Sequence, residues 1–133
     1  MTIHRTLLPA GWKRPKGYSN GISAAGRLVF TAGIVGWDEN EEFRSSDLVD
    51  QFRQVLVNTV MILAEAGARP EHVTRMTWYL LSRDDYVKAL PEIGKAYREI
   101  MGKSFPAMTV VEVGALVEPD ARIEIETTAV VPH

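Results

Sequence analysis

The stretch Leu48–Gly67 (LVDQFRQVLVNTVMILAEAG) carries the clearest structural pattern in the sequence. Its apolar residues recur every three or four positions, as on one face of a helix: Leu48, Phe52, Val55, Leu56, Val60 and Leu63. Ser46 or Asp47 can cap the start, because a short polar side chain there accepts a hydrogen bond from a free backbone N–H. Gly67, followed by Pro70, is typical of a helix end. The stretch therefore predicts one amphipathic helix.

Two short runs before this helix, residues 21–24 and 27–34, predict a β-hairpin. Ala25-Gly26 separates them, and Gly26 is free to adopt the positive φ that tight hairpin turns require. Residues 1–18 are rich in proline, glycine and cations, so we expect irregular structure there.

Three more strands and a second helix are predicted after the first helix. The strands are residues 73–81, 108–113 and 122–131. The second helical stripe runs over residues 86–101, and Pro91 lies within it. Either the helix kinks at Pro91, or a short turn precedes a main helix that has Pro91 in its first turn. The order ββαβαββ predicts one α+β domain over residues 1–133, with both helices on one face of a sheet.

The other face of this sheet is predicted to be chemically mixed. We place on it Met108, Val110 and Glu112 from one strand and Glu124 and Glu126 from the next. Such a face is too polar for a core and too apolar for full exposure to water. Burial against another copy of the chain would resolve this conflict, so we expect a homo-oligomer.

Composition narrows the class of protein. The 133 residues fit one domain, and the formal net charge of −2 lacks the basic surplus of most nucleic-acid-binding proteins, so no nucleic acid is expected as a partner. The absence of cysteine excludes disulfides and a cysteine nucleophile. No apolar run approaches the length of a membrane span, and residues 1–5 do not resemble a secretory signal. We therefore expect a cytoplasmic protein that does not bind membranes.

The three histidines give no sign of a metal site. His4, His72 and His133 lack the close spacing of metal ligands, and we expect them to be ordinary surface residues. The glycines match neither a phosphate-binding loop nor a dinucleotide fingerprint. No metal and no cofactor are therefore expected.

A few polar residues are candidates for chemistry, each with a plainer alternative. Glu124 and Glu126 on a strand can accept a proton or orient water, but two solvated carboxylates would look the same. Tyr18 offers a hydroxyl and a flat ring for a ligand, or for packing. The cations of residues 13–16 can meet an anionic ligand or form a solvated loop. The residue pattern alone leaves these alternatives open.

Pro106-Ala107-Met108-Thr109 begins a longer motif in the C-terminal third of the chain. Val111-Glu112-Val113 and Ile123-Glu124-Ile125 follow it, and together these segments resemble the signature of the RidA/YjgF family. Other segments are similar to family segments in the same order, namely residues 17–21, 28–33 and 51–68. The resemblance covers residues 8–131.

This resemblance implies a fold, an assembly and an activity. It implies a chorismate-mutase-like α+β fold and a homotrimer with a barrel-like core and ligand clefts between subunits. The best-known activity of the family is hydrolysis of reactive enamines and imines to a 2-oxo acid and ammonia. Glu124 matches the family glutamate that positions the attacking water, and Tyr18 matches a tyrosine of the cleft.

Met108 is the main departure from the family pattern, because deaminase members have at this position an arginine that binds the substrate carboxylate. A thioether has no charge and cannot replace the paired hydrogen bonds of a guanidinium. An asparagine of many relatives is also missing, since Leu90 and Pro91 occupy its neighbourhood. The resemblance thus implies Glu124 as the catalytic residue, with these ligand-binding candidates: Tyr18, Met108, Val110, Phe105, Gly33 and Arg14.

Two hypotheses follow from this departure. In the first, the protein is a divergent deaminase whose substrate carboxylate is bound by Arg14, Lys16 or Arg122, or whose substrate is a larger enamine acid of the 2-aminomuconate type. In the second, the trimer retains a ligand cleft with an apolar floor at Met108 but has lost hydrolysis. It would then be a small-molecule-binding, regulatory or chaperone-like protein.

Overall fold

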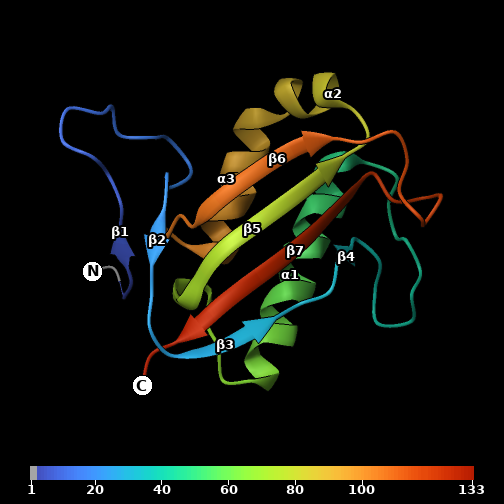
Figure 1. Cartoon of the computed structure of the whole chain (residues 1–133). Coiled ribbons are helices and arrows are strands. Elements are labelled where there is room, and N and C mark those ends of the chain that lie inside the picture. Colours follow the sequence, from blue (N-terminus) through green and yellow to red (C-terminus); the bar gives the residue numbers. More distant parts are fainter. Residues whose placement is uncertain (1–2) are drawn as a thin grey trace.

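A five-stranded sheet forms the centre of the computed structural model, which describes residues 3–133 (Figure 1). Four of its strands lie in the order β3 (Arg27–Phe30), β7 (Ile123–Val131), β5 (Val73–Leu80) and β6 (Ala107–Glu112), and β4 (Ile34–Val35) also pairs with β7. β5 and β6 are parallel, whereas β7 is antiparallel to β3, β4 and β5.

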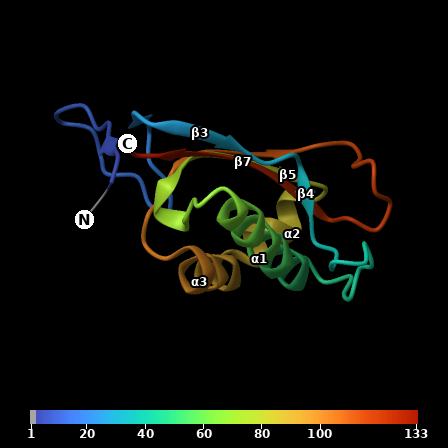
Figure 2. The ribbon, with the colours of Figure 1, turned by 90° about the horizontal axis from the view of Figure 1, so that it is seen from below.

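The helices all lie on one side of this sheet, as Figure 2 shows. They are α1 (Leu48–Glu65), α2 (Arg83–Lys88) and α3 (Leu90–Met101), with a short 3₁₀ turn, η1 (Pro70–His72), before β5. The core between the layers includes Phe52 and Leu56 of α1 and Ile123 and Ile125 of β7, which are fully buried. The predicted α+β architecture, with helices on one sheet face, is confirmed.

Both predicted helices form. The residues that the sequence suggests as the ends of the first helix do terminate it. Asp47 caps α1 by accepting a hydrogen bond from the backbone N–H of Asp50 (3.0 Å), and Gly67 has φ 72° just after the helix. The second helical stripe is divided at Ala89 into α2 and α3, with Pro91 in the first turn of α3. The second of the two alternatives for Pro91 is therefore correct.

The predicted hairpin is wrong. β2 (Ile22–Ser23) pairs with β1 (Arg5–Thr6), a strand in the segment expected to be irregular, and β3 pairs with β7 instead. Gly26 does adopt a positive φ of 149°, and a side chain there would collide with the carbonyl of Val131. This glycine thus lets the chain turn closely past the end of β7 rather than close a hairpin.

The run 27–34 is two strands rather than one. After Phe30, the hydroxyl of Thr31 accepts a hydrogen bond from the backbone N–H of Thr127 (3.1 Å). A side chain has here taken the place of a backbone acceptor, so the regular ladder is interrupted before Ile34 pairs with Ile125. The interruption places Gly33 beside Glu124.

The predicted assignment of sheet faces is also wrong. Met108 lies opposite Met76, which is fully buried beneath the helices, whereas Glu124 lies opposite Tyr79. Directly paired residues share a face, and neighbours along a strand alternate. Met108, Val110 and Glu112 therefore point to the helix side, while Glu124 and Glu126 point to the face that no helix of residues 3–133 covers.

Two of the histidines are not surface residues. His4 and His72 are only 9% and 5% exposed, and Nε2 of His4 lies 3.0 Å from the carbonyl oxygen of His72. Burial lowers the pKa of His72, because the charged imidazolium is poorly solvated there. The pair joins the N-terminal segment to the start of β5, a long-range contact that spacing alone does not indicate.

Gln51 offers a test of the fold. Its side-chain amide donates to the carbonyls of Ser45 and Asp120 and accepts from the backbone N–H of Arg122, all while 1% exposed. Gln51→Leu should lower the free energy of unfolding by about 2–4 kcal/mol, because it leaves three backbone groups unpaired. Urea unfolding measures this. Gln54→Leu, in the next turn, should cost less than about 1 kcal/mol, and equal losses would contradict the assignment.

Candidate functional site

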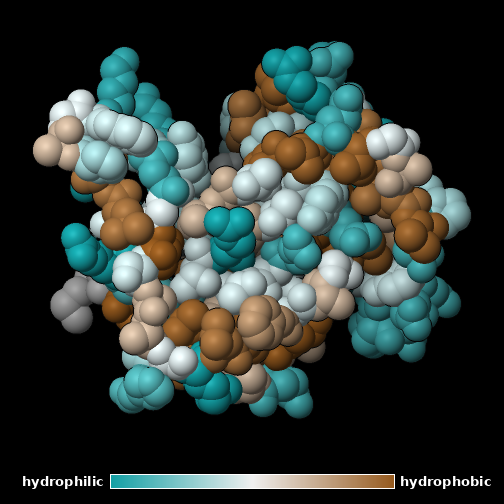
Figure 3. Space-filling model, in the orientation of Figure 1, coloured by the Kyte–Doolittle hydropathy of each residue, from teal (hydrophilic) through white to brown (hydrophobic). Residues whose placement is uncertain are grey.

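A pocket of about 510 Å³ opens between the N-terminal loop, the helices α2 and α3, and strand β6. Figure 3 shows the surface hollowed between the N-terminal loop and α2. The pocket is lined by Lys16, Gly17, Tyr18, Trp78, Tyr86, Leu90, Ile93, Gly94, Tyr97, Arg98, Phe105, Met108 and Val110. Its volume and its largely apolar lining are typical of small-molecule sites, which span roughly 300–1,000 Å³.

Ser19 holds the outer wall of the pocket in place. Its backbone N–H donates to the carbonyl of Pro106 (2.9 Å), and its hydroxyl donates to the carbonyl of Phe105 (2.5 Å). These bonds attach the loop to the segment that leads into β6. Tyr18, the preceding residue, is consequently positioned at the pocket with 43% of its surface exposed.

Aromatic rings form the inner wall. The ring of Tyr97 stacks on Phe105 with centroids 5.5 Å apart and lies 6.2 Å from Trp78. The Tyr97 hydroxyl donates to the carbonyl of Ser104 (3.1 Å), and burial raises the pKa of both Tyr97 and Tyr86. Met108 and Val110, partly buried against the core, complete this wall. The inner part of the pocket is thus uncharged and accommodates apolar groups.

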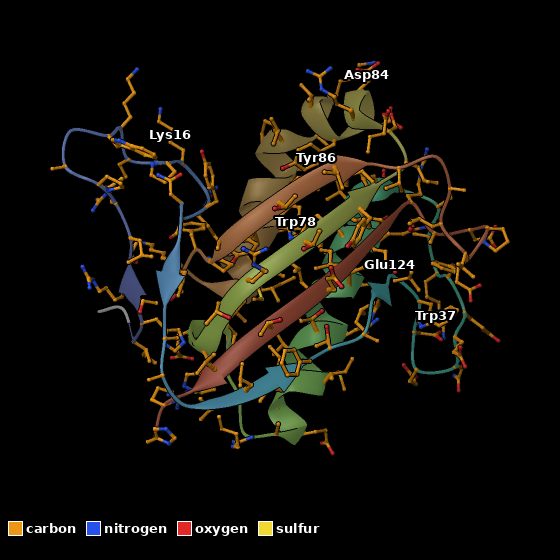
Figure 4. All side chains as sticks on the ribbon, in the orientation of Figure 1. Lys16, Trp37, Trp78, Asp84, Tyr86 and Glu124 are labelled. Atoms are coloured by element: carbon orange, nitrogen blue, oxygen red, sulfur yellow. The ribbon has the colours of Figure 1, made fainter. Side chains whose placement is uncertain are left out.

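Two cations also line this pocket, Lys16 from the N-terminal loop and Arg98 from α3. Both side chains are exposed, and neither forms an ion pair with any other residue of the described range 3–133. Figure 4 labels Lys16 on the loop and Tyr86 on α2, on two sides of the pocket. An anionic group at the mouth would therefore meet positive charge, and an apolar group inside would meet aromatic rings.

Glu124 lies away from this pocket, on the open face of the sheet. It is half-buried, and its carboxylate occupies the space that a side chain at Gly33 would fill. Two positions along β7, Glu126 accepts a hydrogen bond from the Tyr79 hydroxyl (2.7 Å), and this bond raises the pKa of Tyr79. The structure thus brings Glu124 and Gly33 together but separates both from Met108.

The other two cations suggested for a substrate carboxylate, Arg14 and Arg122, lie outside this pocket. Arg14 lines a neighbouring cavity that shares Tyr18 and Phe105 with the pocket. Arg122 instead contacts Asp85 (3.4 Å) and the carbonyl of Ser46 (3.1 Å) and does not line the pocket. Of the three cations suggested for a substrate carboxylate, Lys16 alone lines the pocket.

Sequence reasoning missed Trp78 and Arg98 and treated the helical residues of the wall as core. The predicted apolar stripe of the second helix contains Ile93 and Tyr97, which belong to the core, and Tyr86, which packs against it. The loop 16–18 forms the opposite wall of the pocket. This loop position depends on the contacts of Ser19, and no local pattern predicts them.

Comparison with known proteins identifies the family. The sequence model of the family described as Endoribonuclease L-PSP matches residues 12–131. The chain belongs to this family, which includes the RidA/YjgF proteins. The predicted family and fold class are thus confirmed.

Relatives with known sequences agree with this assignment. The RutC family protein PH0854 of Pyrococcus horikoshii is 39% identical over 113 residues, or 84% of this chain and 85% of that protein. The 3-aminoacrylate deaminase RutC of Acinetobacter baylyi is 35% identical over 92% of this chain and 94% of its own.

Solved structures give the same result. The Rid family protein YyfB of Yersinia pestis, whose function is unknown, has a TM-score of 0.82 and 32% identity, covering 96% of this chain and 98% of its own. Rv2704 of Mycobacterium tuberculosis, a member of the YjgF/YER057c/UK114 family, has a TM-score of 0.64 and 31% identity, covering 86% and 87%. In residues 3–133 we find no helix with the length and apolarity to cross a membrane.

Proposed function

We propose that the protein is a homotrimeric deaminase that hydrolyses an enamine or imine acid. In the imine form, water adds to the C=N carbon, the C–N bond breaks, and the products are a 2-oxo acid and ammonia. The single observation that carries this proposal is that Tyr18, Phe105, Met108 and Val110, all expected at the family's ligand site, line one pocket. The name of the Acinetobacter relative, a 3-aminoacrylate deaminase, supports the reaction class.

Glu124 is the residue proposed to position the water. A carboxylate that is half-buried can accept a hydrogen bond from water and take up its proton as the new C–O bond forms. Since the sheet separates Glu124 from Met108 within one chain, both can serve one site only if the glutamate comes from a neighbouring copy. The geometry therefore favours sites at the boundaries between subunits.

The open face of the sheet supports assembly. Leu28 and Phe30 of β3 are 60% and 68% exposed, and Figure 3 shows apolar side chains gathered over β3 at the lower edge of this face. Val111 of β6 adds a further exposed apolar group. Apolar side chains in such a row are typical of surfaces that other subunits cover.

This assembly can be tested by mass. At micromolar concentration, light scattering should give three times the chain mass of 14.8 kDa. Phe30→Glu should shift the mass towards one chain, because a charge would be buried at each boundary. Met61→Glu is the matched control, since Met61 is 65% exposed on α1, on the other side of the molecule. A single-chain mass for the unmodified protein would contradict the proposal.

The reaction itself can be tested with imines made in place. An amino-acid oxidase converts leucine or alanine to the imine, and semicarbazide traps whatever the protein has not hydrolysed. We expect the protein to suppress trapping of the leucine-derived imine more than that of 2-iminopropanoate, because the pocket is apolar and has no arginine at position 108. No suppression with either imine or with aminoacrylate would exclude the proposed activity.

A second candidate function is binding without hydrolysis. It is favoured by Met108, which places an uncharged thioether at the position of the family's arginine. In that case the trimer would bind 2-oxo acids with unchanged imine lifetimes. Binding by calorimetry together with the trapping assay distinguishes the two functions.

A further inference from the structure

Charge is distributed unevenly along this chain. Residues 1–37 contain five of the fifteen Lys and Arg residues and no Asp or Glu. Three of these cations, Lys13, Arg14 and Lys16, are exposed in the N-terminal loop and form no ion pair within residues 3–133. We call residues 12–16 the cationic loop. It flanks the pocket, because Lys16 lines that pocket and Tyr18 follows two residues later.

Negative charge is concentrated in the turn that follows β4, residues 38–42 (Asp-Glu-Asn-Glu-Glu), which we call the acidic turn. Buried Asp38 fixes its shape. The carboxylate of Asp38 accepts hydrogen bonds from the backbone N–H groups of Asn40 (2.9 Å) and Glu42 (3.0 Å) and pairs with Arg44. The other three acids of the turn are exposed and form no ion pair within the described residues: Glu39, Glu41 and Glu42.

The cationic loop and the acidic turn lie at opposite ends of the molecule. Figure 4 labels Lys16 at one end and Trp37, the residue before the acidic turn, at the other. The two segments therefore do not neutralise each other within one chain. In a closed ring of identical copies, each boundary joins two different surfaces of the chain. Opposite charges at the two ends favour such a boundary, whereas two like ends repel each other.

The position of Glu124 relates the acidic turn to the pocket. In the proposed trimer a neighbouring copy provides Glu124, whose strand partner is Val35. The acidic turn begins three residues after Val35, a length of chain that spans at most about 11 Å. A neighbour that brings Glu124 to the pocket therefore also brings its acidic turn near the rim.

Two elements flank this rim, and their charges differ. The helix α2 has two cations and two acids, so it offers a carboxylate no net attraction, whereas the cationic loop has three cations and no acid. We infer that the acidic turn of each copy docks on the cationic loop of its neighbour, where Lys13 and Arg14 pair with its exposed glutamates. This inference rests on the proposed function, because it requires the homotrimer.

Exchanging the charges tests the docking. Reversing the loop with Lys13→Glu and Arg14→Glu should raise the dissociation constant of the full-chain trimer at least about tenfold at low salt, because like charges then meet. Reversing the turn with Glu39→Lys and Glu41→Lys should have the same effect. A chain with all four substitutions should assemble again to within about threefold of the unmodified protein. Light scattering over a dilution series measures each constant.

Lys88→Glu combined with Lys95→Glu is the matched control. It changes the net charge as much as the reversed loop does, but the two residues are exposed on α2 and α3. Its dissociation constant should stay within about threefold of the unmodified value. Circular dichroism establishes that each variant is folded. An equal effect of the control and the reversed loop, or a folded four-substitution chain that does not assemble, would overturn the inference.

A cross-linking test does not depend on how strongly the charges contribute to assembly. The sequence has no cysteine, so Arg14→Cys and Glu41→Cys each introduce a single thiol. After the two variants are mixed and reassembled, a short bismaleimide should join one chain of each kind, as seen on a denaturing gel. In the control, Met61→Cys on α1 replaces Glu41→Cys and should give no linked pair. The absence of a link between positions 14 and 41 would count against the docking.

The outcomes separate this inference from the proposed function. A three-chain mass that charge reversal does not affect, without a cross-link, would leave the homotrimer intact and overturn the docking. A single-chain mass for the unmodified protein would contradict both. If reversing the loop abolishes binding to a nucleic acid while assembly is unchanged, the loop has another occupant and the inference is wrong.

Discussion

Met108→Arg should raise the rate of 2-iminopropanoate hydrolysis at least about tenfold, since a charge-assisted hydrogen bond is worth about 1.5–3 kcal/mol. Met108 lines the pocket and is partly buried, so a guanidinium there would be partly shielded from water. It can form two parallel hydrogen bonds with the carboxylate of this small imine. The measurement is kcat/KM from the semicarbazide competition assay.

The same substitution should weaken binding of 4-methyl-2-oxopentanoate, because the longer charged side chain fills the apolar part of the pocket. Met61→Arg adds the same charge on the exposed side of α1 and should change neither measurement. If Met108→Arg folds and leaves both unchanged, the pocket is not the substrate site. If it gains no hydrolysis but loses binding, the site has been remodelled for binding alone.

Glu124→Gln should reduce hydrolysis of whichever imine is the best substrate by about 100-fold or more, the usual contribution of a general base. Glutamine has the same shape but cannot take up the proton of the attacking water. The free energy of unfolding should change by less than about 1 kcal/mol, because Glu124 is only half-buried and glutamine has the same shape.

Glu126→Gln is the control for this substitution. Glu126 lies on the same face of β7 but is exposed and paired with the Tyr79 hydroxyl, so we expect near-normal turnover. Should Glu126→Gln prove the more damaging of the two, the wrong carboxylate has been assigned. Equal and complete activity in both variants would remove the proposed role of Glu124.

Much of the fold could be predicted because its helices are determined by local sequence patterns. The three-to-four-residue period of Leu48–Leu63 and the cap at Asp47 predict α1 almost to the residue. The hairpin failed because Gly26 turns the chain past Val131, a contact with the last strand that a two-residue turn signal cannot reveal. Strand pairing of this kind depends on residues about a hundred positions apart, so local sequence does not determine it.

The candidate site could be predicted only in part, for a related reason. The family resemblance predicts Tyr18, Phe105, Met108 and Val110 as ligand-binding residues, and these do line one pocket. The prediction that Met108 and Glu124 share a sheet face is wrong. Alternation along a strand shows which residues of that strand share a face, but the pairing register decides which residues of two strands do so. The register that joins Tyr79 to Glu124 and Met76 to Met108 becomes visible only in three dimensions.

The separation of Met108 and Glu124 by the thickness of one sheet has a consequence for inactive variants. If each chain provides its glutamate to a neighbour's pocket, mixing two inactive chains, one altered at Glu124 and the other in the wall of the pocket, would form some intact sites. The activity restored by mixing would be lost on dilution, because the oligomer dissociates. Turnover per chain would then depend on protein concentration.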